Sequence, residues 1–212
     1  MLNFHEMKLT DFLEELGSSS PAPGGGSVAA VSGALGASLA RMVANLTVGR
    51  EKYAESEEAM TRVRESAIKL AQDFLEQASE DTKAFTSFMK ALSMPKNSDT
   101  EKSARKEAMQ GALKMSTEVP LRILCLSREL SELCLTAAEM GNPNAITDAG
   151  VSALMAGSAA KGAALNAQVN LSSIDDPDYR KTSNAIIERE LVSVEITVSK
   201  VLVRVASSLD PS

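Results

Sequence analysis

Small residues recur at helical spacing between residues 27 and 48, and this pattern constrains the fold more than any other feature of the chain. Gly33, Gly36 and Ala40 lie three or four positions apart, so they share one face of a predicted helix. Such a face lets a neighbouring helix backbone approach closely. A second segment of this kind covers residues 148–171. Two such helices indicate tight helix packing and are also suited to a subunit interface.

The apolar residues of the chain favour helices over sheets. Only 3% of the 212 residues are aromatic, and Trp is absent. A core of Ala, Leu, Val, Ile and Met is typical of close-packed helices. Further helices are predicted over residues 6–16, 56–92 and 98–140, with a last one that begins at Pro177. We therefore expect an all-α, single-domain bundle of long helices over residues 1–212, forming a dimer.

Three local signals refine the helix boundaries. Ser98 and Glu101 have the spacing of a capping box, which predicts a helix start. Pro120 lies inside a predicted helix, and its missing N–H group predicts a kink or a break there. Gly49 is expected to end the helix that precedes it.

Charge and cysteine usage exclude several classes of protein. The net charge is −6 and no basic stripe carries interleaved aromatics, so nucleic-acid binding is not expected. Cys125 and Cys134 are nine residues apart, which puts them on opposite faces of one helix and predicts reduced thiols in a cytoplasmic protein. No metal signature is present, and the single histidine, His5, lies near a terminus. The charged N-terminal segment has no apolar run, so no signal peptide is expected.

Residues Pro23-Gly24-Gly25-Gly26-Ser27 precede the first small-residue helix. The uncharged run from residue 24 to residue 40 is 17 residues long and rich in Ala, Gly and Ser, so no membrane span is expected. A nucleotide-binding loop is also excluded, because no Lys-Ser/Thr pair follows. The exposed N–H groups at this helix start suit an anion or a developing negative charge. A hinge-like entrance to a close-packed helix is the simpler interpretation.

Lys52, Tyr53 and Asp81 carry groups suited to proton transfer or hydrogen bonding. Taken alone, Lys52 and Tyr53 are more simply explained as a solvated basic patch at a helix C-terminus, where the helix dipole favours Lys52. Asp81 lies four residues before Phe85 and seven before Phe88, so it borders an apolar helix face. A carboxylate there is expected to have a raised pKa and to serve as an acid or base, or else to form a salt bridge at the edge of the core.

Polar residues also cluster at the turn before the second small-residue helix. Asn142 and Asn144 lie in this turn, and Asp148 lies at the helix start. Asn166 shares the face of Asp148 five turns later, roughly 27 Å along the axis. One small ring cannot contact both, whereas an elongated ligand or a groove between two subunits could. A helix-packing seam with polar ends is the alternative interpretation.

Five segments in a fixed order carry a family resemblance: SSPAPGGGSVAAVSGALGASLARMVANLTVGREKY, EDTKAF, MPKNSDTEKSAR, EVPL and GNPNAITDAGVSALMAGSAAKGAALNAQVNL. Together they resemble the cyclodeaminase/cyclohydrolase family of folate enzymes over about residues 12–176. The chain departs from the family pattern at Ala22, Arg50, Glu51 and Thr147. Each departure keeps the functional groups of the motif, so the resemblance implies a working enzyme.

The resemblance implies an all-helical homodimer that acts at the N5/N10 bridge of tetrahydrofolate. We expect a methenyltetrahydrofolate cyclohydrolase, which converts 5,10-methenyltetrahydrofolate and water to 10-formyltetrahydrofolate. The alternative is a formimidoyltetrahydrofolate cyclodeaminase, which releases ammonia. The cyclohydrolase is favoured because the 212 residues carry no formiminotransferase domain. A non-catalytic helical scaffold is a third possibility, but it would need neither the polar turns nor the glycines.

The resemblance also implies roles for particular residues. Asp81 and Asp148 are the expected catalytic carboxylates, and Lys52 is a candidate proton donor or a contact for the glutamate tail. No cofactor or metal beyond the folate substrate is expected. The residues implied for substrate binding are Pro23, Gly24, Gly25, Gly26, Ser27, Tyr53, Asn142, Asn144 and Asn166.

Overall fold

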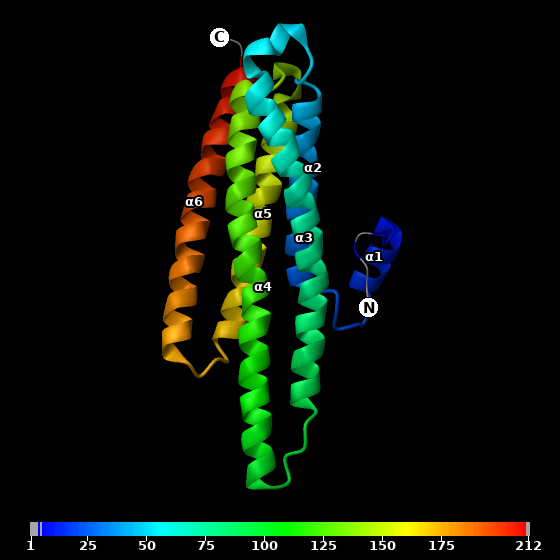
Figure 1. The fold of residues 1–212 in the computed structure, drawn as a ribbon, viewed down its shortest axis with the longest axis vertical. Coiled ribbons are helices and arrows are strands. Elements are labelled where there is room, and N and C mark those ends of the chain that lie inside the picture. The colour runs from blue at the N-terminus through cyan, green and yellow to red at the C-terminus, as the bar shows by residue number, and fades with distance from the viewer. Residues whose placement is uncertain (1–3, 5, 211–212) are drawn as a thin grey trace.

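The computed structural model describes residue 4 and residues 6–210, so His5 lies outside the described residues. Within them the chain forms six α-helices, two short 3₁₀ segments and no β-strand (Figure 1), which confirms the all-α prediction. The α-helices are α1 (Leu9–Leu16), α2 (Gly25–Asn45), α3 (Glu57–Leu92), α4 (Asp99–Met140), α5 (Ile146–Leu171) and α6 (Pro177–Leu209). The 3₁₀ segments are η1 (Glu51–Ser56) and η2 (Pro143–Ala145).

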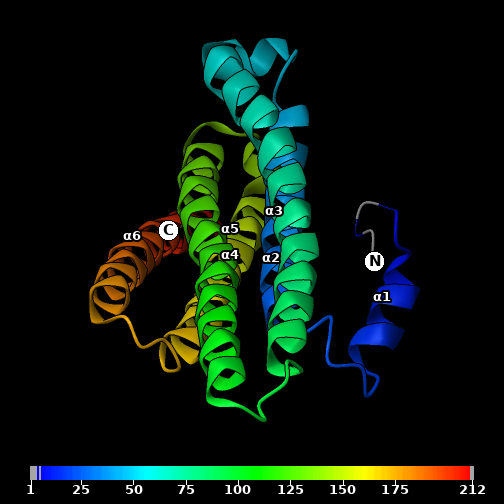
Figure 2. The same ribbon diagram turned by 60° about the horizontal axis from the view of Figure 1, so that its bottom comes forward.

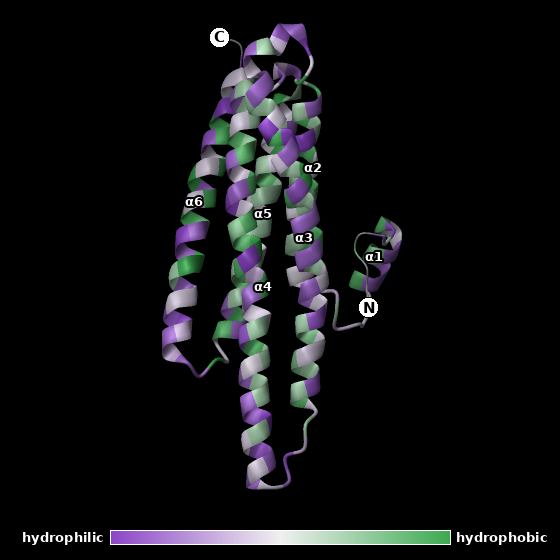
Figure 3. Ribbon diagram, viewed as in Figure 1, coloured by the Kyte–Doolittle hydropathy of each residue, from purple (hydrophilic) through white to green (hydrophobic). Residues whose placement is uncertain are grey.

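Four long helices form the centre of the molecule. α2 packs on α3 and α5, and α4 also packs on α3 and α5, which closes a four-helix arrangement. α6 packs along α4 and α5, whereas α1 lies to one side of the bundle (Figures 1 and 2). Green, hydrophobic turns predominate on α2 and α5, while α3 and α4 alternate between green and purple (Figure 3). The small-residue helices therefore supply the interior of the bundle.

Close helix contacts explain the glycines of α2 and α5. A Cβ on Gly33 would overlap the ring of Phe74, so α3 packs directly on the α2 backbone there. A Cβ on Gly162 would lie 3.1 Å from the Cβ of Ala29, tighter than ordinary van der Waals contact. These contacts confirm the prediction that the small-residue faces let helix backbones approach closely.

Among the described residues, α2 is the one helix long and apolar enough to cross a membrane. It has 21 residues and an 18-residue window of mean hydropathy 1.4, so the exclusion argued above from length and composition does not hold for it. Of that window, 56% is buried inside the protein. A helix packed between α3 and α5 at the centre of a bundle meets the same criteria of length and hydropathy.

Two helix starts follow the sequence signals. The Ser98 hydroxyl accepts a hydrogen bond from the N–H of Glu101, whose carboxylate accepts from the N–H of Ser98 in turn, so the capping box is confirmed. At the start of α6, the carboxylate of Asp176 accepts from the N–H groups of Asp178 and Tyr179.

Two boundary predictions are corrected. α4 continues through Pro120 over 42 residues, so the proline does not break the helix. Gly49 does not cap α2, because α2 ends at Asn45 with Leu46 as its C-cap. Gly49 instead adopts a φ of 75° in the turn before η1, a conformation that glycine tolerates without strain.

Both cysteines are free thiols on α4, as predicted from their spacing. The Sγ of Cys134 lies 3.0 Å from the Oγ of Ser152, which donates a hydrogen bond to the carbonyl of Gly36 at 2.6 Å. Burial raises the pKa of Cys134 to about 12. This thiol therefore ties α2, α4 and α5 together and stays protonated at neutral pH.

Candidate active site

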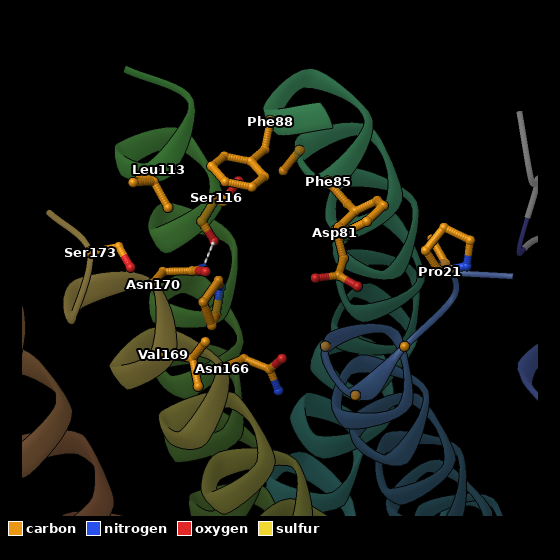
Figure 4. Close-up of a pocket in the computed structure, with 16 residues that line it drawn as sticks. Pro21, Asp81, Phe85, Phe88, Leu113, Ser116, Asn166, Val169, Asn170 and Ser173 are labelled. Carbon is orange, nitrogen blue, oxygen red and sulfur yellow. Dashed lines mark hydrogen bonds between the residues drawn. The ribbon is translucent and has the colours of Figure 1, made fainter. Parts of the chain in front are cut away.

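A cavity of about 380 Å³ lies where the loop before α2 meets α3, α4 and α5 (Figure 4). This volume is within the range of small-molecule sites. The lining combines apolar and polar groups from four segments of the chain. The lining residues are Pro21, Ala22, Gly24, Gly25, Gly26, Asp81, Ala84, Phe85, Phe88, Leu113, Ser116, Pro120, Asn166, Val169, Asn170 and Ser173.

Asp81 is the carboxylate of this cavity, and it projects from α3 toward the start of α2 (Figure 4). Its Oδ2 accepts a hydrogen bond from the hydroxyl of Ser27 at 2.8 Å, and its carboxylate also accepts from the Ser27 N–H. Burial raises the pKa of Asp81 above its ordinary value of 3.8, and the two hydrogen bonds from Ser27 partly oppose that rise. The predicted pKa shift is confirmed, and the ion pairs found among the described residues do not include Asp81.

One of the three consecutive glycines is explained by its neighbours. A Cβ on Gly26 would overlap the carboxylate of Asp81, so only glycine lets that carboxylate reach the start of α2. A Cβ on Gly25 would lie 3.4 Å from the Nδ2 of Asn166, which is ordinary van der Waals contact. A Cβ on Gly24 would have no described atom within 4 Å, and Gly24 lines the open cavity. Gly26 thus brings α2 against Asp81, which is more specific than a hinge.

The opposite wall carries two amides from α5. Asn166 donates from Nδ2 to the carbonyl of Gly162 at 2.8 Å, and Asn170 donates from Nδ2 to the carbonyl of Ser116 at 3.0 Å. The sequence placed Asn166 at the site but did not assign Asn170 to it. The spacing was an available signal, because a residue four positions after Asn166 lies on the same helix face.

The sequence-based prediction also did not identify most of the other residues that line the cavity. Phe85 and Phe88 come from α3, and Leu113 and Ser116 come from α4 (Figure 4). Phe85 and Phe88 were recognised only as the apolar face beside Asp81. Nothing in the local sequence indicates which part of a 42-residue helix lies opposite that face.

Lys52, Tyr53 and Asn142 meet at a different place. The hydroxyl of Tyr53 donates to the Oδ1 of Asn142 at 2.9 Å, and the Nζ of Lys52 lies 5.4 Å from the centre of the Tyr53 ring. These contacts join η1 to the turn before α5.

Asn142 links the turn before α5 to the end of α2 in this arrangement. Its N–H donates to the hydroxyl of Thr47 at 2.9 Å, and its Nδ2 donates to the carbonyl of Leu46 at 3.2 Å. Its Oδ1 already accepts from the N–H of Asn144 and from Tyr53. One N–H of the side-chain amide is not used in these hydrogen bonds, and the role of Asn142 in substrate binding stays a prediction.

The two clusters lie at opposite ends of the bundle. Asp148 lies in the first turn of α5 and Asn166 near its end, roughly 27 Å apart along the helix axis. α2 likewise separates the glycine loop from Lys52 by 21 residues, or about 30 Å of helix. One chain therefore does not bring Lys52 or Asp148 to the cavity of Asp81, and the predicted catalytic trio is not assembled within it. Asn144 is exposed near Asp148.

Among the described residues, no group of three or more His, Cys, Asp or Glu side chains is placed to hold a metal ion. The polar groups at the cavity are one carboxylate, two carboxamides, hydroxyls and backbone groups. This set suits a neutral or cationic organic ring that carries hydrogen-bond donors.

Comparisons with known proteins show which proteins this chain resembles. Residues 8–189 match the family model described as formiminotransferase-cyclodeaminase. A methenyltetrahydrofolate cyclohydrolase from Methylorubrum extorquens is 46% identical over 165 residues, which cover 78% of this chain and 79% of that protein. A formimidoyltransferase-cyclodeaminase from Gallus gallus is 32% identical over 180 residues, covering 85% of this chain but 33% of that longer protein.

One solved structure has the same fold. The crystal structure of a formiminotetrahydrofolate cyclodeaminase from Thermotoga maritima superposes with a TM-score of 0.89 and 27% sequence identity. The superposition covers 97% of this chain and 99% of the other.

Proposed function

Because the chain belongs to the formiminotransferase-cyclodeaminase family, we propose that it is a methenyltetrahydrofolate cyclohydrolase. It adds water to the cationic bridge of 5,10-methenyltetrahydrofolate and yields 10-formyltetrahydrofolate. The observation that carries this function is the half-buried carboxylate of Asp81, with a raised pKa, in a cavity large enough for a pterin ring. The 46% identity to a cyclohydrolase that matches this chain over most of both lengths supports the same activity.

The charge of the substrate explains why a carboxylate is placed in the cavity. The methenyl carbon between N5 and N10 shares a positive charge with both nitrogens. An ionised Asp81 held by Ser27 attracts that cation in a site from which much water is excluded, where electrostatic interactions are strong. Binding of the cation lowers the pKa of Asp81 and keeps the group in its ionised form.

The carboxylate then serves as the base of the reaction. Water attacks the methenyl carbon and gives up one proton to Asp81, which leaves a neutral tetrahedral carbon with one hydroxyl. The bond from this carbon to N5 breaks, N5 takes a proton from Asp81, and the hydroxyl loses its proton as the formyl C=O forms on N10. The net products are 10-formyltetrahydrofolate and one proton. A carboxyl group with a raised pKa can both accept and return a proton in this sequence.

Cyclodeamination of 5-formimidoyltetrahydrofolate is the second candidate, favoured by the structural match to a cyclodeaminase. N10 attacks the formimidoyl carbon and ammonia leaves, so this reaction also passes through a tetrahedral carbon between N5 and N10. Asp81 would then transfer the proton of N10 to the departing ammonia. The same cavity suits both reactions, which share the tetrahedral carbon but differ in the nucleophile, water or N10, and in the leaving group, N5 or ammonia.

The homodimer is part of our proposal. α2 exposes Val28, Leu35 and Met42 at seven-residue spacing, and α5 exposes Leu154 and Leu165. Such apolar stripes on adjacent helices are suited to pairing with a second copy.

A two-fold axis perpendicular to the helices would make the paired bundles antiparallel. The Lys52 end of one protomer would then lie beside the Asp81 end of its partner, which is the arrangement that the separated clusters require. Lys52 would act there as a contact for the glutamate tail, while Asp148 would add a second carboxylate. We also propose a cytoplasmic location and no metal requirement, in keeping with the two free thiols.

The substitution Asp81→Asn tests the proposed role of this carboxylate. Loss of the base and of the charge should lower turnover by about 10²–10⁴-fold while folate still binds in equilibrium dialysis. The control is Glu80→Gln, which removes one charge from the neighbouring position of α3, outside the cavity lining. Full turnover in a folded Asp81→Asn variant would refute the assignment, and a protein that binds no folate would be a scaffold.

A further inference from the structure

Pro120 is buried in the middle of α4 and lines the cavity. Proline has no N–H group, so the carbonyl of residue 116, one turn earlier, receives no backbone hydrogen bond from it. A proline in a helix interior lowers the stability of the helix by about 3 kcal/mol relative to alanine. α4 nevertheless continues as one helix through Pro120. The free carbonyl is therefore accommodated by another group.

That group is the side chain of Asn170. Its Nδ2 donates to the carbonyl of Ser116 at 3.0 Å across the interface between α4 and α5 (Figure 4). Because a carbonyl can only accept, the NH₂ of the amide must face it and the Oδ1 must face the other way. Asn170 lines the cavity, so its Oδ1 is left as an acceptor for a ligand.

Asn166 has the same arrangement one turn earlier. Its Nδ2 is used by the carbonyl of Gly162 at 2.8 Å, which leaves its Oδ1 as a second acceptor on the cavity wall. The hydroxyl of Ser116 completes the group, because its Oγ is buried and has no hydrogen-bond partner among the residues that the structure describes. A buried hydroxyl without a partner is costly, so a ligand that occupies the cavity is expected to bond to it.

We infer that Asn170 is a specificity-determining residue, whose Oδ1 accepts hydrogen bonds from the N–H groups of the aminopyrimidinone ring of the folate substrate. Asn166 provides the second acceptor and the Ser116 hydroxyl donates to the ring carbonyl. Pro120 is a positioning residue, because it frees the Ser116 carbonyl that orients Asn170. This inference rests on the proposed folate function.

The hydrogen-bond donors of the aminopyrimidinone ring match the acceptors that Asn166 and Asn170 present to the cavity. The aminopyrimidinone ring of tetrahydrofolate offers donors at its amino group and at the adjacent ring N–H, next to one carbonyl acceptor. Phe85 and Phe88 add flat apolar surface at the mouth of the cavity (Figure 4). An analogue with oxygen in place of the amino group would set an acceptor against the acceptor of Asn170, and a site built for a donor rejects such a ligand.

The test compares folic acid with its 2-oxo counterpart, in which oxygen replaces the amino group, by equilibrium dialysis. The wild-type protein should prefer folic acid by about tenfold or more, the worth of one or two hydrogen bonds. In Asn170→Leu the two affinities should approach each other, with KM for the substrate raised about tenfold and kcat nearly unchanged. The control is Gln168→Leu, an exposed position on the same helix, which should behave as wild type.

The outcomes separate this inference from the function on which it rests. If the wild-type protein turns over the substrate but Asn170→Leu keeps the full preference for folic acid, the role of Asn170 is wrong and the function stands. If the wild-type protein binds neither ligand and has no turnover, the proposed function has failed and the inference falls with it.

A double-mutant cycle tests the part played by Pro120. Pro120→Ala restores an N–H group to the helix, which competes with Asn170 for the Ser116 carbonyl and frees the amide to rotate. The substitution should weaken folic acid binding several-fold in the wild-type background and have no further effect in Asn170→Leu. An equal effect in both backgrounds would show that Pro120 acts by its own contacts and would overturn the positioning role.

Discussion

At the scale of single residues, Asp81 combines a functional requirement with a cost in stability. Burial favours its protonated form, so an ionised Asp81 makes the folded state less stable at neutral pH than an amide of the same shape would. The hydrogen bonds from Ser27 recover only part of that cost. Sites that must hold a charge for catalysis often show this trade between activity and stability.

This trade predicts how stability varies with pH. The pKa of Asp81 is higher in the folded state than in the unfolded state, so the folded state keeps this proton to higher pH. The free energy of unfolding therefore falls as the pH rises from about 4 through the folded-state pKa. Asp81→Asn lacks this loss, and its free energy of unfolding should exceed that of the wild type by a margin that grows with pH and then levels off. Urea unfolding of both proteins between pH 4 and pH 8 measures the margin. A constant difference across this range would contradict the assignment.

Gly26 provides a second residue-scale prediction. The Cβ of Gly26→Ala would overlap the Asp81 carboxylate, which must then turn away from Ser27. We expect a folded protein whose kcat falls by at least about tenfold, because a small misplacement of a catalytic group is costly. The control is Gly111→Ala, where a Cβ meets no other atom within 4 Å and kcat should be unchanged. An active Gly26→Ala variant would mean that the hydrogen bond from Ser27 does not position the carboxylate.

The residue scale also shows what sequence alone can find. The spacing of Asp81 from two phenylalanines predicted a carboxylate at an apolar border, because helical periodicity is a local property. The hydrogen-bond partners of Asn142 were not predictable, since they come from Thr47 and Leu46, about 95 positions away. Its role depends on which helix ends meet, and no local pattern encodes that.

At the scale of helices, α6 is held to α4 by a nearly buried carboxylate. Glu190, 4% exposed, accepts from Arg128 at 2.9 Å and pairs with Arg189. Arg128→Met should lower the free energy of unfolding by about 2 kcal/mol, because it leaves a buried charge with one partner fewer. Lys161→Met, which removes the exposed pair between α5 and α6, should cost less than about 1 kcal/mol. Equal effects in thermal or urea unfolding would show that the buried pair has no special role.

Helix positions were predictable to within a few residues, and the behaviour at Pro120 was not. Caps such as Ser98 and Asp176 act within one turn, so their sequence signals sufficed. The Ser116 carbonyl freed by the proline accepts a hydrogen bond from Asn170 of α5, 54 residues further along the chain. An isolated helix would have no such partner, which is why the local rule predicted a kink or a break.

At the scale of the whole molecule, the separation of the two polar clusters gives a prediction about assembly. If Lys52 of one protomer serves the Asp81 site of its partner, then Lys52→Met and Asp81→Asn should each lose activity alone. Mixed after unfolding and refolding together, they should recover about a quarter of wild-type turnover, since half of the dimers are mixed and each has one intact site. No recovery from a mixture shown to contain mixed dimers would contradict the antiparallel arrangement.

The central claim is that this helical protein hydrolyses the methenyl bridge of tetrahydrofolate at Asp81. The most direct test is one steady-state experiment on the purified protein, which follows the loss of the methenyl chromophore and, in parallel, ammonia release from 5-formimidoyltetrahydrofolate. We predict that the methenyl substrate disappears well above its uncatalysed rate, that this excess vanishes in Asp81→Asn, and that ammonia release is slow. A folded protein that accelerates neither reaction would contradict the account.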